Sequence, residues 1–185
     1  MNIPGKDKRG LVKILFSFLF ILFFTGCGYT TQSLLNSEYK TVHVSPVVNK
    51  IQFTGESQEY SKFRSVPPLL ADRLTKSLIS RFNLDGHLKT VKEGVSDVTL
   101  SCEINDYVRD TLRYDDNNNV EEYRLKLYLT YFLTDNQGKL KNKKSLIADT
   151  EYSLTGSAAK SEASALNDLV DDASRRIVED IIETW

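Results

Sequence analysis

Apolar and polar residues alternate along two long stretches of the chain, residues 98–105 and 123–133. This period of two is typical of β-strands that bury one face and leave the other in water. Between them lies Asp115–Asn119, a run of residue types that readily adopt the left-handed backbone angles of turns. We therefore expect a long antiparallel hairpin. Its buried face is predicted to consist of Val98, Leu100, Cys102, Ile104, Tyr123, Leu125, Leu127, Leu129, Tyr131 and Leu133.

Weaker patterns predict three further strands. Residues 145–155 follow the turn sequence Asn136-Gln137-Gly138 and extend the hairpin into a three-stranded meander, with Leu146, Ala148, Tyr152 and Leu154 on one face. A first strand is expected over Tyr39–Val48, where Val42, Val44 and Pro46 share one side, and Pro46 suggests that this strand ends there or lies at a sheet edge. A short strand is expected over Leu88–Lys92.

Two other stretches repeat their apolar residues every three or four positions, which predicts amphipathic helices. The first helix is expected over Pro67–Phe82, since proline is tolerated in a first helical turn. The second helix is expected to begin after Ser161, whose hydroxyl can act as an N-cap, and to end at about Thr184. Its apolar face comprises Ala163, Leu166, Leu169, Val170, Ala173, Ile177 and Ile181.

Taken together, the principal elements follow the order β-α-β-β-β-α. Helices and strands that are each apolar on one side must cover one another. We therefore predict an α+β fold over residues 39–185. It is a single domain in which two helices pack on one face of a mostly antiparallel four-stranded sheet.

The N-terminal segment has a different character. Basic residues precede an uninterrupted run of apolar or small residues, Ile14–Phe24, which is shorter than the approximately 20 residues that a membrane-spanning helix needs. This layout predicts a signal peptide over residues 1–26. The sequence Phe24-Thr25-Gly26-Cys27 resembles a bacterial lipobox, in which the cysteine receives a diacylglycerol group and then an N-acyl chain. Residues 27–38 would form a lipidated tether, and Gly28 favours delivery to the outer membrane over retention at the inner one.

Charge and cysteine content narrow the range of functions. Residues 1–26 hold four basic and one acidic residue, so the mature chain has 20 basic and 24 acidic residues and a formal charge of −4. This balance argues against nucleic-acid binding. With Cys27 acylated, Cys102 is the remaining thiol, and no internal disulfide can form. The alternating pattern around Cys102 favours a buried hydrophobic role over a reactive thiol.

The motifs of common enzyme classes are absent from the sequence. We find no nucleophile elbow, phosphate-binding loop or zinc-binding helix motif, and neither His43 nor His87 has a second ligand at helical spacing. Asp115–Asn119 begins like a calcium loop but lacks its glycine and its final glutamate, so a turn is the better interpretation. We expect a protein that is not an enzyme, with no metal site and no cofactor beyond the lipid on Cys27.

One group of polar residues suggests binding chemistry. Arg109, Arg113, Arg124 and Lys126 all belong to the predicted hairpin, and Lys160 precedes the positive N-terminal end of the second helix. Both places can bind anions. The alternative is that these residues are ordinary solubilising charges on an exposed sheet face.

The order of several short motifs resembles one family. These motifs are Cys27-Gly28-Tyr29, Asp97-Val98-Thr99-Leu100 and Glu122-Tyr123-Arg124-Leu125, followed by the terminal amphipathic helix. Together they are similar to the lipopolysaccharide-assembly lipoprotein family, whose members plug the outer-membrane lipopolysaccharide translocon. The resemblance extends over residues 27–185 and implies two helices on one side of a four-stranded sheet.

The resemblance also implies partners and contact residues. Members of this family sit inside a large β-barrel, help it to fold and bind lipopolysaccharide through basic residues. Arg113 and Lys160 occupy similar places in this chain, with Arg109 close by in the sequence, so we expect these three to contact lipopolysaccharide phosphates. The acidic pair Asp115-Asp116 beside Arg113 departs from the family pattern and would weaken a phosphate site there.

Two other functions fit an outer-membrane lipoprotein of this size. One is a periplasmic activator of a cell-wall synthase, and the other is a pilot lipoprotein for a secretin. Recovery of a large β-barrel with the tagged protein would favour the translocon function, whereas recovery of a glycosyltransferase would favour the activator.

Overall fold

The computed structural model describes residues 39–51 and 66–183. The predicted signal peptide, the lipidation site Cys27 and the tether 27–38 lie outside these described residues. Among the described helices, none is both long enough and apolar enough to cross a membrane.

Three long antiparallel strands form the body of the sheet. Strands β4 (Val98–Tyr114) and β5 (Val120–Asp135) pair along nearly their whole length, with Leu100 opposite Leu133 and Ile104 opposite Leu129. Strand β6 (Leu140–Ser153) continues the meander on the other side of β5. The predicted hairpin and meander are therefore confirmed.

The sheet has six strands instead of the predicted four, because the first predicted strand is divided into two and the short strand expected over Leu88–Lys92 also joins the sheet. Strand β1 (Thr41–Val44) pairs with β4 and also with β3 (Lys89–Thr90), while β2 (Val48–Asn49) pairs with β4 further along. The main path is β3-β1-β4-β5-β6. The sheet is thus mixed, with long antiparallel pairs and a few short parallel ones.

The first strand, predicted over Tyr39–Val48 with Pro46 as its end or an edge position, stops at Val44, and a separate short strand follows at Val48. Val42 and Val44 are buried as expected, but Pro46 is exposed and Val47 turns inward in its place. Proline has no backbone N–H to donate to a neighbouring strand, so the ladder is interrupted between β1 and β2.

Helix α3 spans Leu70–Asp85 and begins three residues later than predicted. A residue that precedes proline is disfavoured in the helical region, so Pro68 opposes a helical conformation at Pro67. Leu69 then adopts a left-handed conformation with φ of 61°, and the helix follows it. At the other end, Gly86 with φ of 81° ends the helix by donating its N–H to the carbonyl of Phe82.

Helix α4 spans Glu162–Glu183 and starts where the sequence predicted. The Ser161 hydroxyl accepts a hydrogen bond from the N–H of Ser164 at 3.2 Å, which is the expected N-cap contact. Glu162 lies in the first turn, where a negative charge is favourable.

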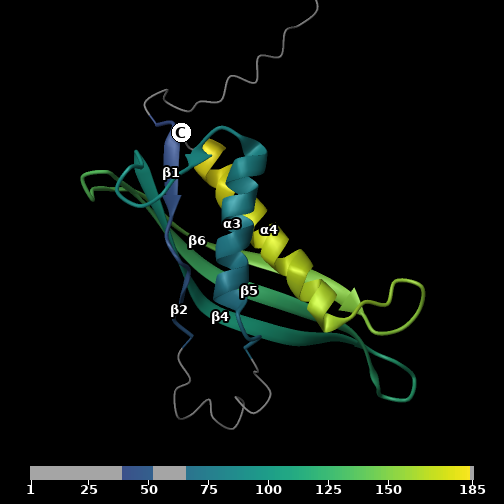
Figure 1. Ribbon diagram of the computed structural model, residues 1–185. Helices are drawn as coiled ribbons and strands as arrows, with labels where there is room; N and C mark the ends of the chain where they lie inside the picture. Colours follow the sequence, from purple (N-terminus) through teal and green to yellow (C-terminus); the bar gives the residue numbers. More distant parts are fainter. Residues whose placement is uncertain (1–38, 52–65, 184–185) are drawn as a thin grey trace, which may run out of the picture. The chain divides into compact units, whose positions relative to one another are not determined.

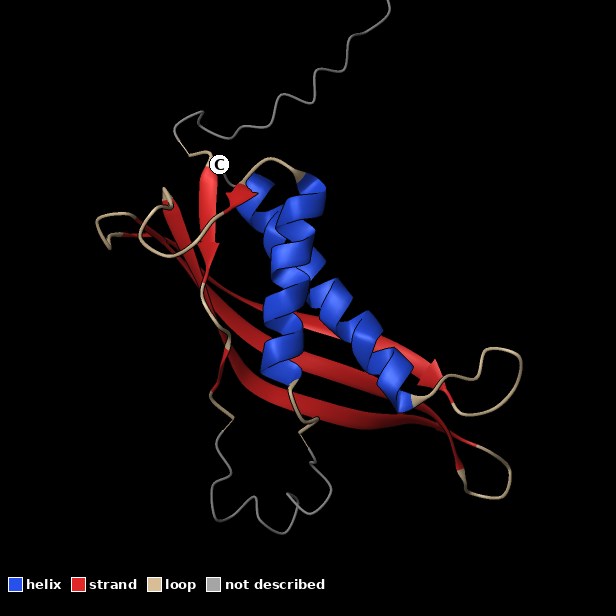
Figure 2. Ribbon diagram, viewed as in Figure 1, coloured by secondary structure: helices blue, strands red, loops and turns tan. Residues whose placement is uncertain are grey.

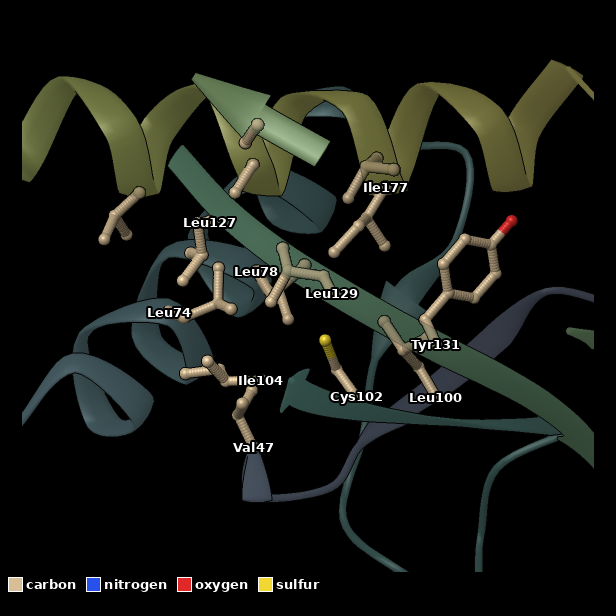
Figure 3. Close-up of a cluster of buried hydrophobic side chains, with 14 of the residues drawn as sticks. Val47, Leu74, Leu78, Leu100, Cys102, Ile104, Leu127, Leu129, Tyr131 and Ile177 are labelled. Atoms are coloured by element: carbon tan, nitrogen blue, oxygen red, sulfur yellow. The ribbon is translucent and has the colours of Figure 1, made fainter. Parts of the chain in front are cut away.

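Both helices cover the same face of the sheet, as predicted (Figures 1 and 2). Leu74 and Leu78 of α3 and Ile177 of α4 are fully buried against β4 and β5 (Figure 3). Cys102 lies in the middle of this layer and is 1% exposed, so its predicted role as a buried small hydrophobe is confirmed. Burial in this apolar layer raises the pKa of the Cys102 thiol to about 12.

The last strand was predicted too far along the chain. Strand β6 starts at Leu140, which follows the turn directly and pairs with Thr134 of β5. The strand ends at Ser153. Consequently Ala148 and Tyr152 are buried as expected, whereas Leu154 lies beyond the strand and is exposed. Lys141, Lys143 and Lys144 belong to this edge strand, where charged side chains discourage pairing with other chains.

Candidate functional site: a cationic pocket at the start of two helices

The predicted cations gather at one end of the domain, the hairpin end, which carries the turn Asp115–Asn119 and the start of α4 (Figure 1). Glu122 on β5 pairs with Arg113 on one side and with Ser153 on the other. The Ser153 carbonyl in turn accepts the N–H of Lys160 at 2.9 Å. With about 4.8 Å between neighbouring strands, the backbones of Arg113 and Lys160 are roughly 14 Å apart along one row of the sheet.

The turn at the hairpin end was predicted correctly. The Asp115 carboxylate accepts hydrogen bonds from the N–H groups of Asn117 and Asn119, and Asn118 has a φ of 67°. The Asn119 side chain, followed by its backbone N–H, lowers the pKa of Asp115. Asp115 is thus a structural part of this turn.

An irregularity in β4 determines where Arg109 lies. The register shifts between Ile104 and Asp106, so the buried positions change from even to odd residue numbers and Tyr107 turns inward. Arg109 stands opposite the fully buried Leu125 and therefore lies on the helix-covered side of the sheet. The alternative of a solubilising charge on the open sheet face does not apply to Arg109.

Tyrosine rings and one carboxylate surround Arg109. Its guanidinium carbon lies 5.0 Å from the centre of the Tyr123 ring, and its Nη1 donates to the Glu162 carboxylate at 2.8 Å. Tyr123 stacks obliquely on Tyr152, with 5.6 Å between ring centres. The aromatic contact and the ion pair hold the guanidinium in one orientation at the start of α4.

Partial burial and neighbouring charges shift the pKa values of the residues in this cluster. Burial opposes the charge of Arg109, but the Glu162 carboxylate and the neighbouring tyrosines outweigh it, so the pKa of Arg109 is raised. Burial, followed by the negative charge of Glu162, raises the pKa of Tyr107 and of Tyr152. The Tyr107 hydroxyl is buried and has no hydrogen-bond partner among the described residues.

A pocket of about 470 Å³ opens beside Arg109, between the starts of α3 and α4. Arg73 and Arg109 supply positive charge, and Glu162 supplies one negative charge. The remaining lining residues, Pro67, Pro68, Ala163 and Leu166, are apolar. Its volume lies within the approximately 300–1,000 Å³ that small-ligand pockets occupy.

Arg73 is the residue of this pocket that the sequence did not reveal. It lies on the exposed side of α3, one turn after the helix start, where its N–H donates to the carbonyl of Leu69. A basic residue close to the positive end of a helix is a weak local signal, because acidic residues are favoured near this end. Its importance becomes visible only when α3 packs beside Arg109.

The other predicted cations are paired with carboxylates near the surface. Arg113 is 58% exposed and lies 3.0 Å from Glu121, while Lys160 lies 2.8 Å from Asp168. On the open face of the sheet, Arg124 pairs with Glu151 across β5 and β6, and Lys126 pairs with Asp110 at 2.8 Å. Arg124 and Lys126 thus fit the solubilising interpretation and lie on the face opposite Arg109.

The structure resembles several solved proteins at low sequence identity. A protein from Xanthomonas campestris is 14% identical, with 79% of this chain and 85% of that chain covered and a TM-score of 0.53. An uncharacterized lipoprotein B from Nitrosomonas europaea is also 14% identical, with 79% and 84% covered and a TM-score of 0.51. A hypothetical protein from Chlamydia trachomatis is 14% identical, with 77% and 95% covered and a TM-score of 0.50. These similarities support the fold.

A comparison with curated proteins found no match. The LptE family model, described as lipopolysaccharide-assembly, matches residues 39–183, which include both of the described helices and all six of the described strands. Because this match covers most of the chain, the protein belongs to the LptE family, a non-enzymatic family that acts in lipopolysaccharide assembly at the outer membrane.

Proposed function

We propose that this member of the family is a lipoprotein that plugs the β-barrel lipopolysaccharide translocon and helps it to assemble. In this role the domain contributes surface and binding groups, and it aids the insertion of lipopolysaccharide into the outer membrane. The observation that carries the proposal is the gathering of Arg109, Arg113 and Lys160 at the hairpin end of a domain whose family acts in lipopolysaccharide assembly.

The mature protein is held at the membrane by a lipid anchor at its N-terminus. Residues 1–26 act as a signal peptide, Cys27 receives the acyl groups, and residues 27–38 connect the lipid to the domain, 39–185. One acyl chain gives only marginal membrane binding, whereas several chains on Cys27 give a stable anchor. The anchor keeps the domain on the periplasmic side of the outer membrane or within the barrel lumen.

In this proposal Arg109, Arg113 and Lys160 contact the phosphates of lipopolysaccharide. Each is already paired with a carboxylate, so a phosphate must compete with Glu162, Glu121 and Asp168 respectively. A phosphate with two negative charges can displace these single carboxylates, because ion pairs near the surface are worth only about 0–1 kcal/mol. Binding should weaken as salt is added.

A binding measurement tests the phosphate contacts. The variant Arg113→Asp with Lys160→Asp, in the full chain purified in detergent, should bind lipopolysaccharide at least about tenfold more weakly at low salt. Lys89→Asp with Lys92→Asp is the matched control, because it makes the same charge change on exposed residues at the opposite end of the sheet. Equal affinity of the test variant and the control would remove these contacts from the proposal.

Co-purification tests the partner. A tagged full-length chain, extracted from outer membranes in mild detergent, should bring down one large heat-modifiable β-barrel protein. Recovery of a cell-wall glycosyltransferase without such a barrel would contradict the proposal and favour an activator of cell-wall synthesis.

A further inference from the structure

The pocket between the starts of α3 and α4 contains charged side chains that are not needed to hold the two helices together. Arg109 is held by Tyr123 and paired with Glu162, while Arg73 forms no ion pair with any of the described residues. Two guanidinium groups and one carboxylate therefore line the same cavity. The cavity carries an excess positive charge that is not neutralised from within the described part of the chain.

A second observation points to a missing polar partner. The Tyr107 side chain is 3% exposed, and its hydroxyl has no hydrogen-bond partner among the described residues. It lies close enough to Glu162 and Arg109 for their charges to act on it. Buried hydroxyls are normally satisfied, so a rearrangement of Glu162 that offers Tyr107 a partner would be favourable.

We infer that this pocket binds a phosphate monoester carried beside an apolar group, and that Glu162 is an internal competitor for it. The Glu162 carboxylate is paired with Arg109 at the place where the anion would bind. An incoming phosphate binds Arg109 and Arg73 together and displaces Glu162. This inference rests on the proposed contact with lipopolysaccharide. It adds a particular pocket, a second arginine and a carboxylate of the protein that competes with the ligand.

The chemistry of the pocket favours a phosphate monoester over other anions. Two guanidinium groups offer planar pairs of donors that match phosphate oxygens, and the dianion can use both, whereas a single carboxylate satisfies one. The N-terminal end of α4 adds its positive dipole at the same point. Pro67, Pro68 and Leu166 form an apolar wall that suits the non-polar part of a phosphorylated lipid.

Glu162 could have either of two roles: it could compete with the phosphate for Arg109, or it could hold Arg109 in place for the phosphate. If Glu162 only held Arg109 in place, its neutralisation would weaken ligand binding. If it competes, Glu162→Gln should strengthen binding by about two- to fivefold, the size of a partly exposed ion pair. The two roles therefore predict changes of opposite sign.

The experiment measures binding to the full chain purified in detergent, with three probes: diphosphorylated lipid A, dephosphorylated lipid A and inorganic phosphate. Glu162→Gln should raise the affinity for diphosphorylated lipid A, and Arg73→Gln should lower it about tenfold. Arg109→Lys keeps the charge and removes the planar fork, so it should abolish the gain caused by Glu162→Gln in the double variant. Glu179→Gln is the matched control, because it neutralises a paired glutamate at the far end of the same helix.

The outcomes distinguish this inference from the function on which it rests. A gain with diphosphorylated lipid A or inorganic phosphate supports the site, and the probe that shows it identifies a lipid headgroup or free phosphate as the source. An equal gain with dephosphorylated lipid A, or none with any probe while the wild-type chain binds lipid A, overturns this inference alone. If neither the wild-type chain nor Glu162→Gln binds any probe, the proposed phosphate contacts fall with it.

Discussion

Thr41 and Asp97, 56 residues apart, bind each other reciprocally where β1 meets β4. The Thr41 hydroxyl donates to the Asp97 carboxylate at 2.7 Å, and the Asp97 N–H donates to the same hydroxyl oxygen at 2.9 Å. The carboxylate also accepts the N–H groups of Lys40 and Thr41, both at 2.9 Å. One side chain thus fixes the start of the parallel pair and the register of Val42 opposite Val98.

Replacement of Asp97 by alanine should therefore destabilise the domain. The variant loses three hydrogen bonds to a charged group at a partly exposed position, and we expect the free energy of unfolding to fall by about 1–3 kcal/mol. Urea denaturation at pH 7 measures the change. Asp116→Ala, at an exposed position of the hairpin turn, is the control and should change stability by less than about 0.5 kcal/mol.

The Asp97 carboxylate should also make the stability of the domain depend on pH. The Lys40 N–H, followed by the Thr41 hydroxyl, lowers the pKa of Asp97 in the folded state below its ordinary value. The contribution of Asp97 to stability is therefore complete above the unfolded pKa of about 3.9 and is lost as the pH falls through the folded pKa. The stability difference between wild type and Asp97→Ala should shrink across this acidic range. A difference that stays constant from pH 7 to pH 2 would contradict the role of the ionised carboxylate.

Replacing either of two leucines of α3 by alanine should have contrasting effects on the stability of the domain. Leu74 is fully buried beneath the helices, whereas Leu84 on the same helix is 77% exposed. Leu74→Ala should lower the free energy of unfolding by about 2–5 kcal/mol, because it removes apolar contacts and leaves a cavity. Leu84→Ala, which makes the same chemical change, should alter it by less than about 0.5 kcal/mol. Chemical denaturation of both variants checks this, and similar losses would show that the buried layer is wrongly assigned.

Cys102 should be unreactive until the domain unfolds. Burial raises the pKa of its thiol to about 12, and only the thiolate reacts with alkylating reagents. In a Cys27→Ala background at pH 8, we expect alkylation about a thousandfold slower than for an exposed thiol of pKa about 8.5. Mass spectrometry with iodoacetamide measures the rate, with the urea-unfolded chain as the control. Rapid modification of the folded chain would contradict the buried position.

Cys27 should determine where the protein is found in the cell. Cys27→Ala removes the thiol that receives the acyl groups, so the chain should move from the outer-membrane fraction to soluble or unprocessed forms. Fractionation and mass spectrometry of the mature N-terminus measure this, with Ser33→Ala in the tether as the control. An unmodified Cys27 in wild-type protein would refute the lipid anchor.

The meander was predictable because its signals are local. The alternation of Leu125, Leu127 and Leu129 requires only that one face of a strand be buried, and the turn residues Asp115–Asn119 lie between the two halves of the hairpin. The start of α4 at Ser161 was predictable for the same reason, since an N-cap acts on the residues that follow it. The start of α3 was missed because Pro68 restricts Pro67, a local effect that the general tolerance of proline in first turns conceals.

Periodicity in the chain by itself determined the fold class, the buried faces of the long strands and the two helices that cover them. Tertiary structure alone decided that β1 docks parallel to β4, that the irregularity after Ile104 turns Arg109 under the helices, and that Arg73 and Glu162 reach the same pocket. The physical reason is distance along the chain. A repeating pattern records which side of an element avoids water, whereas the meeting of Arg109 with Glu162 across 53 residues depends on how the whole of α4 packs across the sheet.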